Sequence, residues 1–326
     1  MDIKLQKMQF LGAFGILQEA HKIIFTWRKI FSQITLFFIF PLSLFFLAYL
    51  HIFNHMIRNF LFQIILTKTQ KDPPKFINLS DLVMSYKWAY LWLFTVAYSG
   101  FLSVVSIPST ASVAYAVASI YTGNGEASFK DSLKAVAKVW KRVLVTSFYT
   151  LTFSLTYSSV AALVLVTISW LCARFKASIF IVYMVMFFVG SLYLDTIWIL
   201  SRVVSVLEET YGFKALMKSQ RLLRGKMAAA AVLLFFVSSC LVLVQFLCNK
   251  VAVNGVVGKG ILGILCFVFL VHVLLLKVVV QVELYFICKS YHCENIDMSS
   301  DVSGLVGVYV SLKTNDVQLE TERLLV

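Results

Sequence analysis

Six long apolar stretches are the feature of this chain that most restricts its fold. They cover residues 30–53, 86–121, 143–173, 177–201, 227–248 and 260–288. A helix needs about 20 apolar residues to cross the hydrocarbon core of a bilayer, and every stretch reaches that length. Because backbone polar groups in lipid must be paired within their own segment, each stretch is predicted to be a helix. The sequence therefore predicts an all-α, polytopic membrane helical bundle with about six transmembrane helices.

The composition supports a membrane protein and argues against several other classes. Hydrophobic residues make up 60% of the 326 residues, against about 45–50% in ordinary soluble domains. Basic residues of membrane proteins collect near anionic lipid surfaces, so the net charge of +13 does not predict a nucleic-acid partner. The chain has no Gly-rich phosphate loop, no His-Glu-x-x-His and no nucleophile motif. No enzymatic activity, cofactor or metal is therefore expected.

The distribution of Lys and Arg predicts the orientation. The N-terminus, two alternate loops and the C-terminal tail carry 19 of these residues, whereas the segments on the opposite side carry nine. The positive-inside rule places the richer set, and with it both termini, in the cytosol. Residues 1–288 are expected to form a single six-helix transmembrane domain. Residues 289–326 are expected to be a short cytosolic tail.

A basic segment recurs in front of alternate apolar stretches. Residues 129–134 and 213–218 both read Phe-Lys-x-x-(Leu/Met)-Lys. In the first copy Phe129, Leu133, Val136 and Trp140 share one face of a helix, and Ser128 with Asp131 is typical of a capping box. A weaker third copy near the N-terminus places Phe10, Phe14, Leu17 and Ile24 on one face. The pattern predicts three units of an amphipathic helix and a helical hairpin, at about 10–121, 125–208 and 212–288.

These basic segments suit helices that lie in the membrane interface. The apolar face would enter the acyl region while the cations stay at anionic headgroups, each contributing about 1 kcal/mol. The alternative is that the helices only cover the cytosolic ends of the bundle. The residues predicted to face lipid or a cytosolic protein partner are Lys130, Lys134, Lys138, Lys141, Lys214, Lys218, Arg221 and Arg224.

Three ionisable residues fall within apolar stretches. Asp195 lies in the fourth stretch, and Lys277 and Glu283 lie in the sixth. Charges at such depth usually face a bundle interior or a wet cavity. We expect Asp195 and Lys277 to pair across helices, or Lys277 to extend to the cytosolic surface. The functional alternative is an ion or proton step in a transporter.

Hydroxyl residues form a stripe on each of two predicted helices. Such stripes usually mediate close helix packing, and a polar permeation path is the alternative. The first is Ser99, Ser103, Ser106 and Thr110, and the second is Thr146, Thr150, Ser154 and Ser158.

Several isolated residues give weaker signals. His51 and His55 are expected at the interface, and His272 is expected to hydrogen-bond within the bundle. Pro41 and Pro108 are expected to bend their helices.

Other single residues suggest modification or sorting. Cys288 and Cys293 flank a membrane exit, where the alternative to inert thiols is palmitoylation. Asn78 begins a glycosylation sequon, and Glu320 with Leu324 and Leu325 resembles an acidic dileucine sorting signal.

Three segments carry a resemblance to a known family. Residues 8–15, 27–35 and 288–292, with the tail fragment 316–320, resemble a family of plant multi-pass membrane proteins without an assigned function, some of which are named as polyadenylate-binding-protein-binding-protein-like. More distantly, residues 207–225 are similar to the membrane region of some glycerophosphodiester phosphodiesterases. A separate soluble domain performs the chemistry in those enzymes, so this likeness implies a membrane fold without the activity.

The sequence thus predicts a non-enzymatic membrane protein of the plant endomembrane system, such as the ER or vacuole, or of the plasma membrane. Its expected partners are the lipid bilayer, including anionic headgroups, and a cytosolic protein. The alternative is a secondary transporter or channel that uses Asp195 and Lys277.

Overall fold

All the secondary structure in the described part of the chain is helical, in agreement with the predicted all-α class. The computed structural model describes residues 12–69, 77–122, 129–171, 176–251 and 256–292. The helices are α2 (Ala13–Thr26), α3 (Arg28–Ile34), the π-helix η1 (Thr35–Ile39), α4 (Phe40–Thr69), α5 (Ile77–Thr122), α6 (Phe129–Leu171), α7 (Lys176–Leu207), α8 (Phe213–Leu223), α9 (Met227–Val251) and α10 (Val256–Tyr291).

Within these described residues, six helical segments are long and apolar enough to cross a membrane. They are Arg28–Asn59, Ala89–Tyr121, Phe129–Ile168, Phe180–Leu207, Met227–Val244 and Gly263–Tyr291. Each overlaps one predicted apolar stretch. The prediction of a polytopic helical protein is therefore confirmed.

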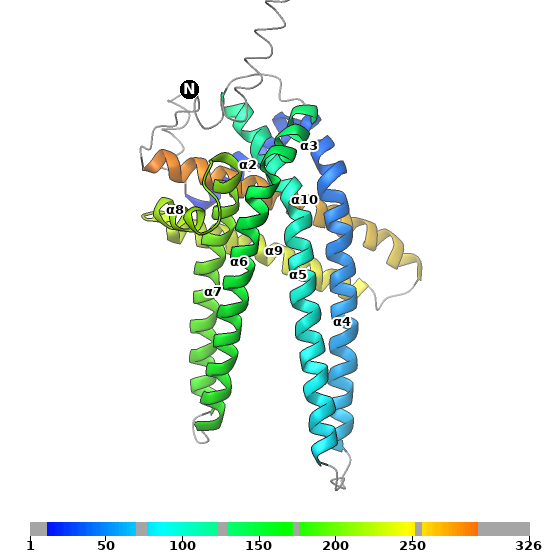
Figure 1. Ribbon diagram of the computed structural model, residues 1–326. Coiled ribbons are helices and arrows are strands. Elements are labelled where there is room, and N and C mark those ends of the chain that lie inside the picture. The colour runs from blue at the N-terminus through cyan, green and yellow to red at the C-terminus, as the bar shows by residue number, and fades with distance from the viewer. Residues whose placement is uncertain (1–11, 70–76, 123–128, 172–175, 252–255, 293–326) are drawn as a thin grey trace, which may run out of the picture.

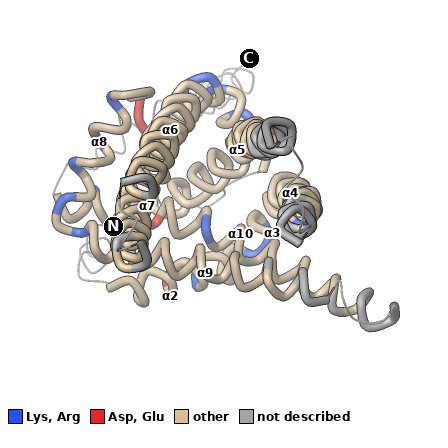
Figure 2. The backbone as a smooth tube through the Cα atoms, turned by 90° about the horizontal axis from the view of Figure 1, so that it is seen from below, with Lys and Arg blue, Asp and Glu red and all other residues tan. Residues whose placement is uncertain are grey.

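The helices form three hairpins with two different directions. The α4–α5 and α6–α7 hairpins project to the same side of the molecule (Figure 1). The α9–α10 hairpin runs across them, as the view from below also shows (Figure 2). Helix α2 packs on α9 and α10, and α8 packs on α7.

The projecting parts of the first two hairpins expose large apolar side chains. Examples are Phe45, Ile52, Trp92 and Leu93 of the first hairpin and Leu163, Val166, Ile181 and Met186 of the second. Lipid tails are as apolar as leucine, so such side chains gain nothing from burial inside the protein. This surface is what a membrane-embedded hairpin requires.

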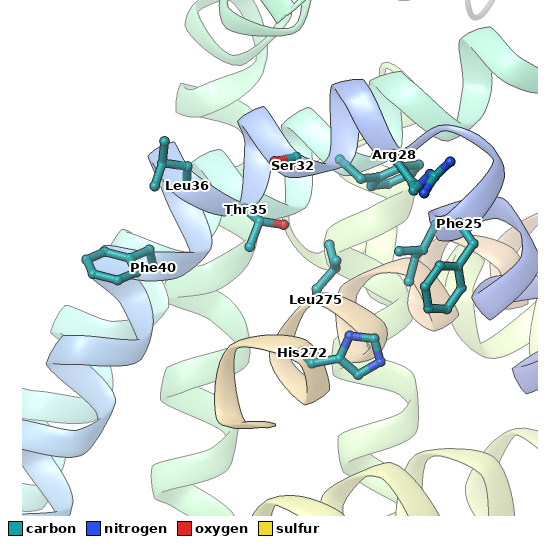
Figure 3. Close-up of a pocket in the computed structure, with 10 residues that line it drawn as sticks. Phe25, Arg28, Ser32, Thr35, Leu36, Phe40, His272 and Leu275 are labelled. Atoms are coloured by element: carbon teal, nitrogen blue, oxygen red, sulfur yellow. The ribbon is translucent and has the colours of Figure 1, made fainter. Parts of the chain in front are cut away.

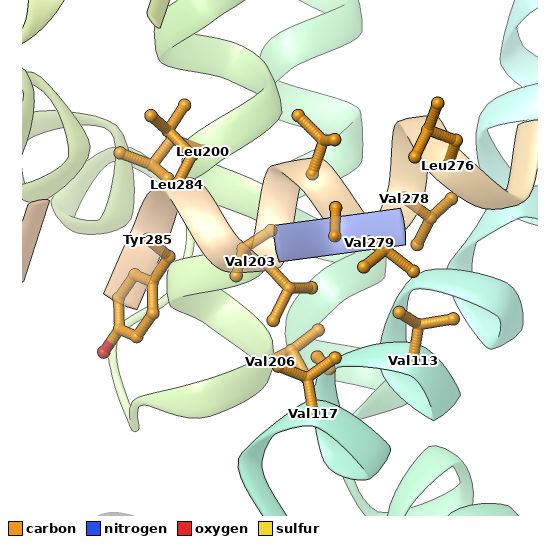
Figure 4. Close-up of a cluster of buried hydrophobic side chains, with 14 of the residues drawn as sticks. Val113, Val117, Leu200, Val203, Val206, Leu276, Val278, Val279, Leu284 and Tyr285 are labelled. Carbon is orange, nitrogen blue, oxygen red and sulfur yellow. The ribbon is translucent and has the colours of Figure 1, made fainter. Parts of the chain in front are cut away.

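The buried core lies where the three hairpins meet. Val113 and Val117 of α5, Val203 of α7 and Val279 of α10 pack together there (Figure 4). The same end of α5 buries several alanines, which let helices approach closely. The C-terminal end of α5 therefore contributes to the core.

The two expected proline bends take different forms. Helix α5 continues through Pro108. Just before Pro41 the chain forms the π-helix η1 instead of an α-helix. Pro41 has no backbone N–H to donate to the carbonyl of Phe37, so the regular hydrogen-bond pattern is interrupted there. The resulting π-turn shifts the side chains that follow α3.

Candidate functional site

Basic side chains gather at the end of the molecule that holds the core. Seven of the eight predicted basic residues are exposed, namely Lys130, Lys134, Lys138 and Lys141 of α6, Lys214 and Arg221 of α8, and Arg224 just after α8. Figure 2 shows the blue segments along α8 and α6. We call these seven residues the basic surface.

The helices that carry the basic surface differ from the predicted interfacial helices. The apolar face of α8, with Leu216, Leu222 and Leu223, is buried against the protein, where we predicted contact with the acyl region. Helix α6 has no break between its basic segment and its membrane span. Of the apolar face predicted for α6, Leu133 and Trp140 are exposed, whereas Phe129 and Val136 pack against the core.

The eighth basic residue, Lys218, has a protein partner. Its Nζ lies 2.6 Å from Oε2 of Glu208, at the C-terminal end of α7. Oε1 of Glu208 accepts a 2.8 Å hydrogen bond from the Tyr285 hydroxyl and lies 3.6 Å from Nζ of Lys289. We call Glu208, Lys218, Tyr285 and Lys289 the Glu208 cluster. Lys289 is buried, so packing continues past the predicted start of the tail at residue 289.

A cavity lies where the N-terminal helices turn toward the first membrane span. Helices α2 and α3 are joined at Trp27, and α3 leads through η1 into α4. The cavity between this elbow and α10 has a volume of about 510 Å³. We call it the elbow cavity, and it is lined by Ile24, Phe25, Arg28, Phe31, Ser32, Thr35, Leu36, Phe40, His272 and Leu275.

Polarity changes in order along one wall of the elbow cavity. Arg28, Ser32 and Thr35 succeed one another along α3 and the start of η1, followed by Leu36 and Phe40 (Figure 3). Apart from Phe31, which also lines the cavity, this wall passes from a cation to two hydroxyls and then to apolar side chains. This is the order of groups in a phospholipid, from its phosphate through its ester linkages to its acyl chains.

Two polar groups of this wall have no partner among the protein groups that the structure describes. Oγ1 of Thr35 is buried and has no hydrogen-bond partner in the described part of the chain. Such a group is costly unless something pairs with it. Among the residues that the structure describes, no carboxylate lies within 4.0 Å of Arg28. Both groups are therefore available to a polar or anionic ligand.

The opposite wall comes from α10. His272 and Leu275 face the elbow from that helix (Figure 3). The His272 ring lies 5.3 Å from the His21 ring of α2, measured between centroids. We expected His272 to hydrogen-bond within the bundle, but in the described residues it contacts His21 through its ring instead.

The predicted pair of Asp195 and Lys277 is not formed. No ion pair within 4.0 Å joins them in the described structure. Asp195 is exposed and Lys277 is half-buried. Glu283 is fully buried and accepts a 2.7 Å hydrogen bond from the Tyr121 hydroxyl. Solute transport through Asp195 and Lys277 stays a prediction.

The two hydroxyl stripes have different surroundings. Ser103, Ser106 and Thr110 line a second cavity together with Lys277. Thr146 instead bonds to Ser205 across to α7, at 2.7 Å, and accepts a hydrogen bond from the Gly212 backbone. Three residues of the first stripe thus line a cavity, whereas the start of the second stripe joins helices.

Some predicted residues give no site. Cys288 is fully buried, which contradicts its palmitoylation, and His51 and His55 are exposed. The following lie outside the described residues or have side chains outside them: Phe10, Asn78, Ser128, Cys293, Glu320, Leu324 and Leu325.

Comparison with known proteins identifies a family but no activity. Residues 1–322 match the family described as Domain of unknown function (DUF8558). The chain belongs to this family. Searches of the curated proteins and of the solved structures found no significant match. The match to DUF8558 spans the described helices and both cavities, so a function must be argued from their geometry.

Sequence reasoning missed the residues that complete both cavities. Thr35 and Ser32 lie in an apolar stretch without a stripe of hydroxyls, and Arg202 and Gln281 were not singled out. The spacing of Arg28, Ser32 and Thr35 by four and three residues was the one available signal. It did not show that α10 would face them, because contact between distant helices is not encoded in local spacing.

Proposed function

We propose that this chain is a non-enzymatic integral membrane protein that binds anionic phospholipid in the elbow cavity. The observation that supports this proposal is the ordered wall of Arg28, Ser32, Thr35, Leu36 and Phe40. A guanidinium forms strong, charge-assisted hydrogen bonds with phosphate. The Thr35 hydroxyl can donate a hydrogen bond to an ester oxygen of the lipid, which would give its buried Oγ1 a partner.

The apolar end of the same wall suits an acyl chain. Leu36 is 71% exposed and Phe40 is 40% exposed, so both offer surface to a lipid tail. Both residues belong to the membrane-spanning segment Arg28–Asn59, and Arg28 is the first residue of this segment. A phosphate at Arg28 would thus lie at the membrane boundary, where headgroups are found.

The basic surface supports the same function at longer range. Each Lys or Arg close to an anionic leaflet contributes about 1 kcal/mol of attraction. The seven exposed cations would raise the local concentration of anionic lipid beside the elbow. The same residues, together with exposed Phe213 and Met217 on α8, are also the surface that a cytosolic protein partner would contact.

The proposal includes an orientation and a compartment. The excess of Lys and Arg favours a cytosolic position for both termini, and the resemblance to plant membrane proteins supports the endomembrane system or plasma membrane. Tags at either terminus are expected to react with an impermeant label only after the plasma membrane is opened. Labelling of one terminus from the opposite side would contradict the orientation.

Removing the Arg28 charge tests lipid binding. The full chain is placed in phosphatidylcholine nanodiscs with increasing fractions of phosphatidylserine, and thermal unfolding reports binding. We expect Arg28→Gln to weaken the response to phosphatidylserine about tenfold, because a charge-assisted hydrogen bond is lost. Lys29→Gln is the matched control, since Lys29 is exposed but does not line the cavity. Equal responses of the two variants would contradict the proposed site.

A further inference from the structure

The second cavity lies deeper, between the first and third hairpins and α7. It has a volume of about 200 Å³, below the usual size of pockets for drug-sized ligands. Its polar wall combines the α5 hydroxyls with Arg202 of α7 and with Lys277 and Gln281 of α10. We call it the inner cavity. Its size suits a single small polar group and not a whole lipid.

The charge of the inner cavity is one-sided. Arg202 and Lys277 both line it, and none of the described lining residues is acidic. Asp195 interacts electrostatically with both cations, but no carboxylate of the described chain lies within 4.0 Å of either. Both cations belong to membrane-spanning segments. Unpaired charges are costly there, so a bound anion would stabilise this arrangement.

The hydroxyls of the inner cavity indicate which anion fits. Ser103, Ser106 and Ser109 donate to carbonyls of their own helix at 2.7–2.8 Å, and Thr110 donates to the Ser106 carbonyl at 3.1 Å. Their protons are therefore engaged, and their oxygens present lone pairs to the cavity. While the hydroxyls keep these bonds, a ligand that meets both walls carries negative charge toward Arg202 and Lys277 and a proton toward the hydroxyl oxygens.

Hydrogen phosphate meets both requirements. It is an anion that keeps at least one P–OH at neutral pH, whereas sulfate has no proton to donate. We infer that the inner cavity is a binding site for a phosphate group that retains a P–OH, held by Arg202, Lys277 and Gln281 and discriminated by the α5 hydroxyls. Free inorganic phosphate and the headgroup of phosphatidic acid share this chemistry. The inner site is independent of lipid binding at Arg28.

The test titrates the full chain in phosphatidylcholine nanodiscs with inorganic phosphate and with sulfate at constant ionic strength. Calorimetry and thermal unfolding measure binding. We expect saturable stabilisation by phosphate, and at least about tenfold weaker binding by Arg202→Gln and by Lys277→Gln. Lys22→Gln is the control, because it removes one exposed charge away from the cavity. Phosphate binding that is the same in wild type, Arg202→Gln and Lys277→Gln would overturn the site.

Additional measurements distinguish free phosphate from a lipid phosphate and test the role of the hydroxyls. If only phosphatidic acid in the nanodisc stabilises the protein, and Arg202→Gln removes this effect, the phosphate belongs to a lipid. No response to either source would overturn the inference.

Ser106→Ala, which keeps both cations, is expected to reduce the preference for phosphate over sulfate. Equal binding of sulfate by wild type would overturn discrimination by the hydroxyls. Arg28→Gln should leave phosphate binding unchanged, so this proposal and the elbow site can fail separately.

Discussion

Glu208→Gln is expected to lower the free energy of unfolding by about 3–5 kcal/mol, because it breaks a buried ion pair by removing one partner. The Glu208 carboxylate accepts from the Tyr285 hydroxyl and lies 3.6 Å from Lys289. Side chains of Glu208 and Lys289 are only 4% and 7% exposed. Without the carboxylate, the Lys289 ammonium would remain buried beside a neutral amide.

The partly exposed lysine of the cluster should matter much less. The Lys218 side chain is 32% exposed, so water already solvates its ammonium group and screens its attraction to Glu208. Without Lys218, the Glu208 carboxylate still has Lys289 and the Tyr285 hydroxyl as partners. Lys218→Gln is therefore expected to cost about 1 kcal/mol or less. A difference between Glu208→Gln and Lys218→Gln would show that burial of Lys289, and not the short contact to Lys218, sets the size of the effect.

Unfolding by SDS in mixed micelles, followed by tryptophan fluorescence, measures these differences. Glu209→Gln is the matched control, since it removes the same charge from the exposed neighbouring position. We expect it to unfold like the wild type. If Glu208→Gln also unfolds like the wild type, the cluster does not hold the ends of α7 and α10 together.

Local pattern was enough to predict the membrane helices. Each apolar stretch exceeds the length of a bilayer crossing, and backbone pairing leaves helix as the only realistic conformation. Helix α8 shows the limit of this reasoning. Its Leu216, Leu222 and Leu223 repeat with helical period whether they face lipid or protein, and the structure shows that they face protein.

The sites depend on contacts between residues that are far apart in sequence. Arg28 and His272 share the elbow cavity, and Glu208 bonds to Tyr285 77 residues away. Such contacts depend on the crosswise direction of the α9–α10 hairpin (Figure 2). Hydropathy gives the length of a span but not its direction relative to other hairpins. The elbow cavity therefore could not be predicted without the structure.

The turn between α7 and α8 depends on a glycine that no motif identified. Gly212 has φ of 63° and ψ of −136°, a backbone region that residues with a side chain rarely adopt. Its N–H donates a 2.8 Å hydrogen bond to Oγ1 of Thr146. A Cβ at this position would lie 3.3 Å from Cε2 of Tyr149. The conformation thus places the start of α8 against α6, next to Glu208.

Gly212→Ala is accordingly expected to lower the free energy of unfolding by about 1–3 kcal/mol, through backbone strain at this one residue. The same micelle assay measures the change. Gly263→Ala is the control, because Gly263 is helical and an added Cβ would meet no atom within 4 Å. There the substitution should leave stability unchanged or raise it by up to about 1 kcal/mol. If Gly212→Ala behaves like Gly263→Ala, the turn tolerates an ordinary residue and its geometry does not position α8.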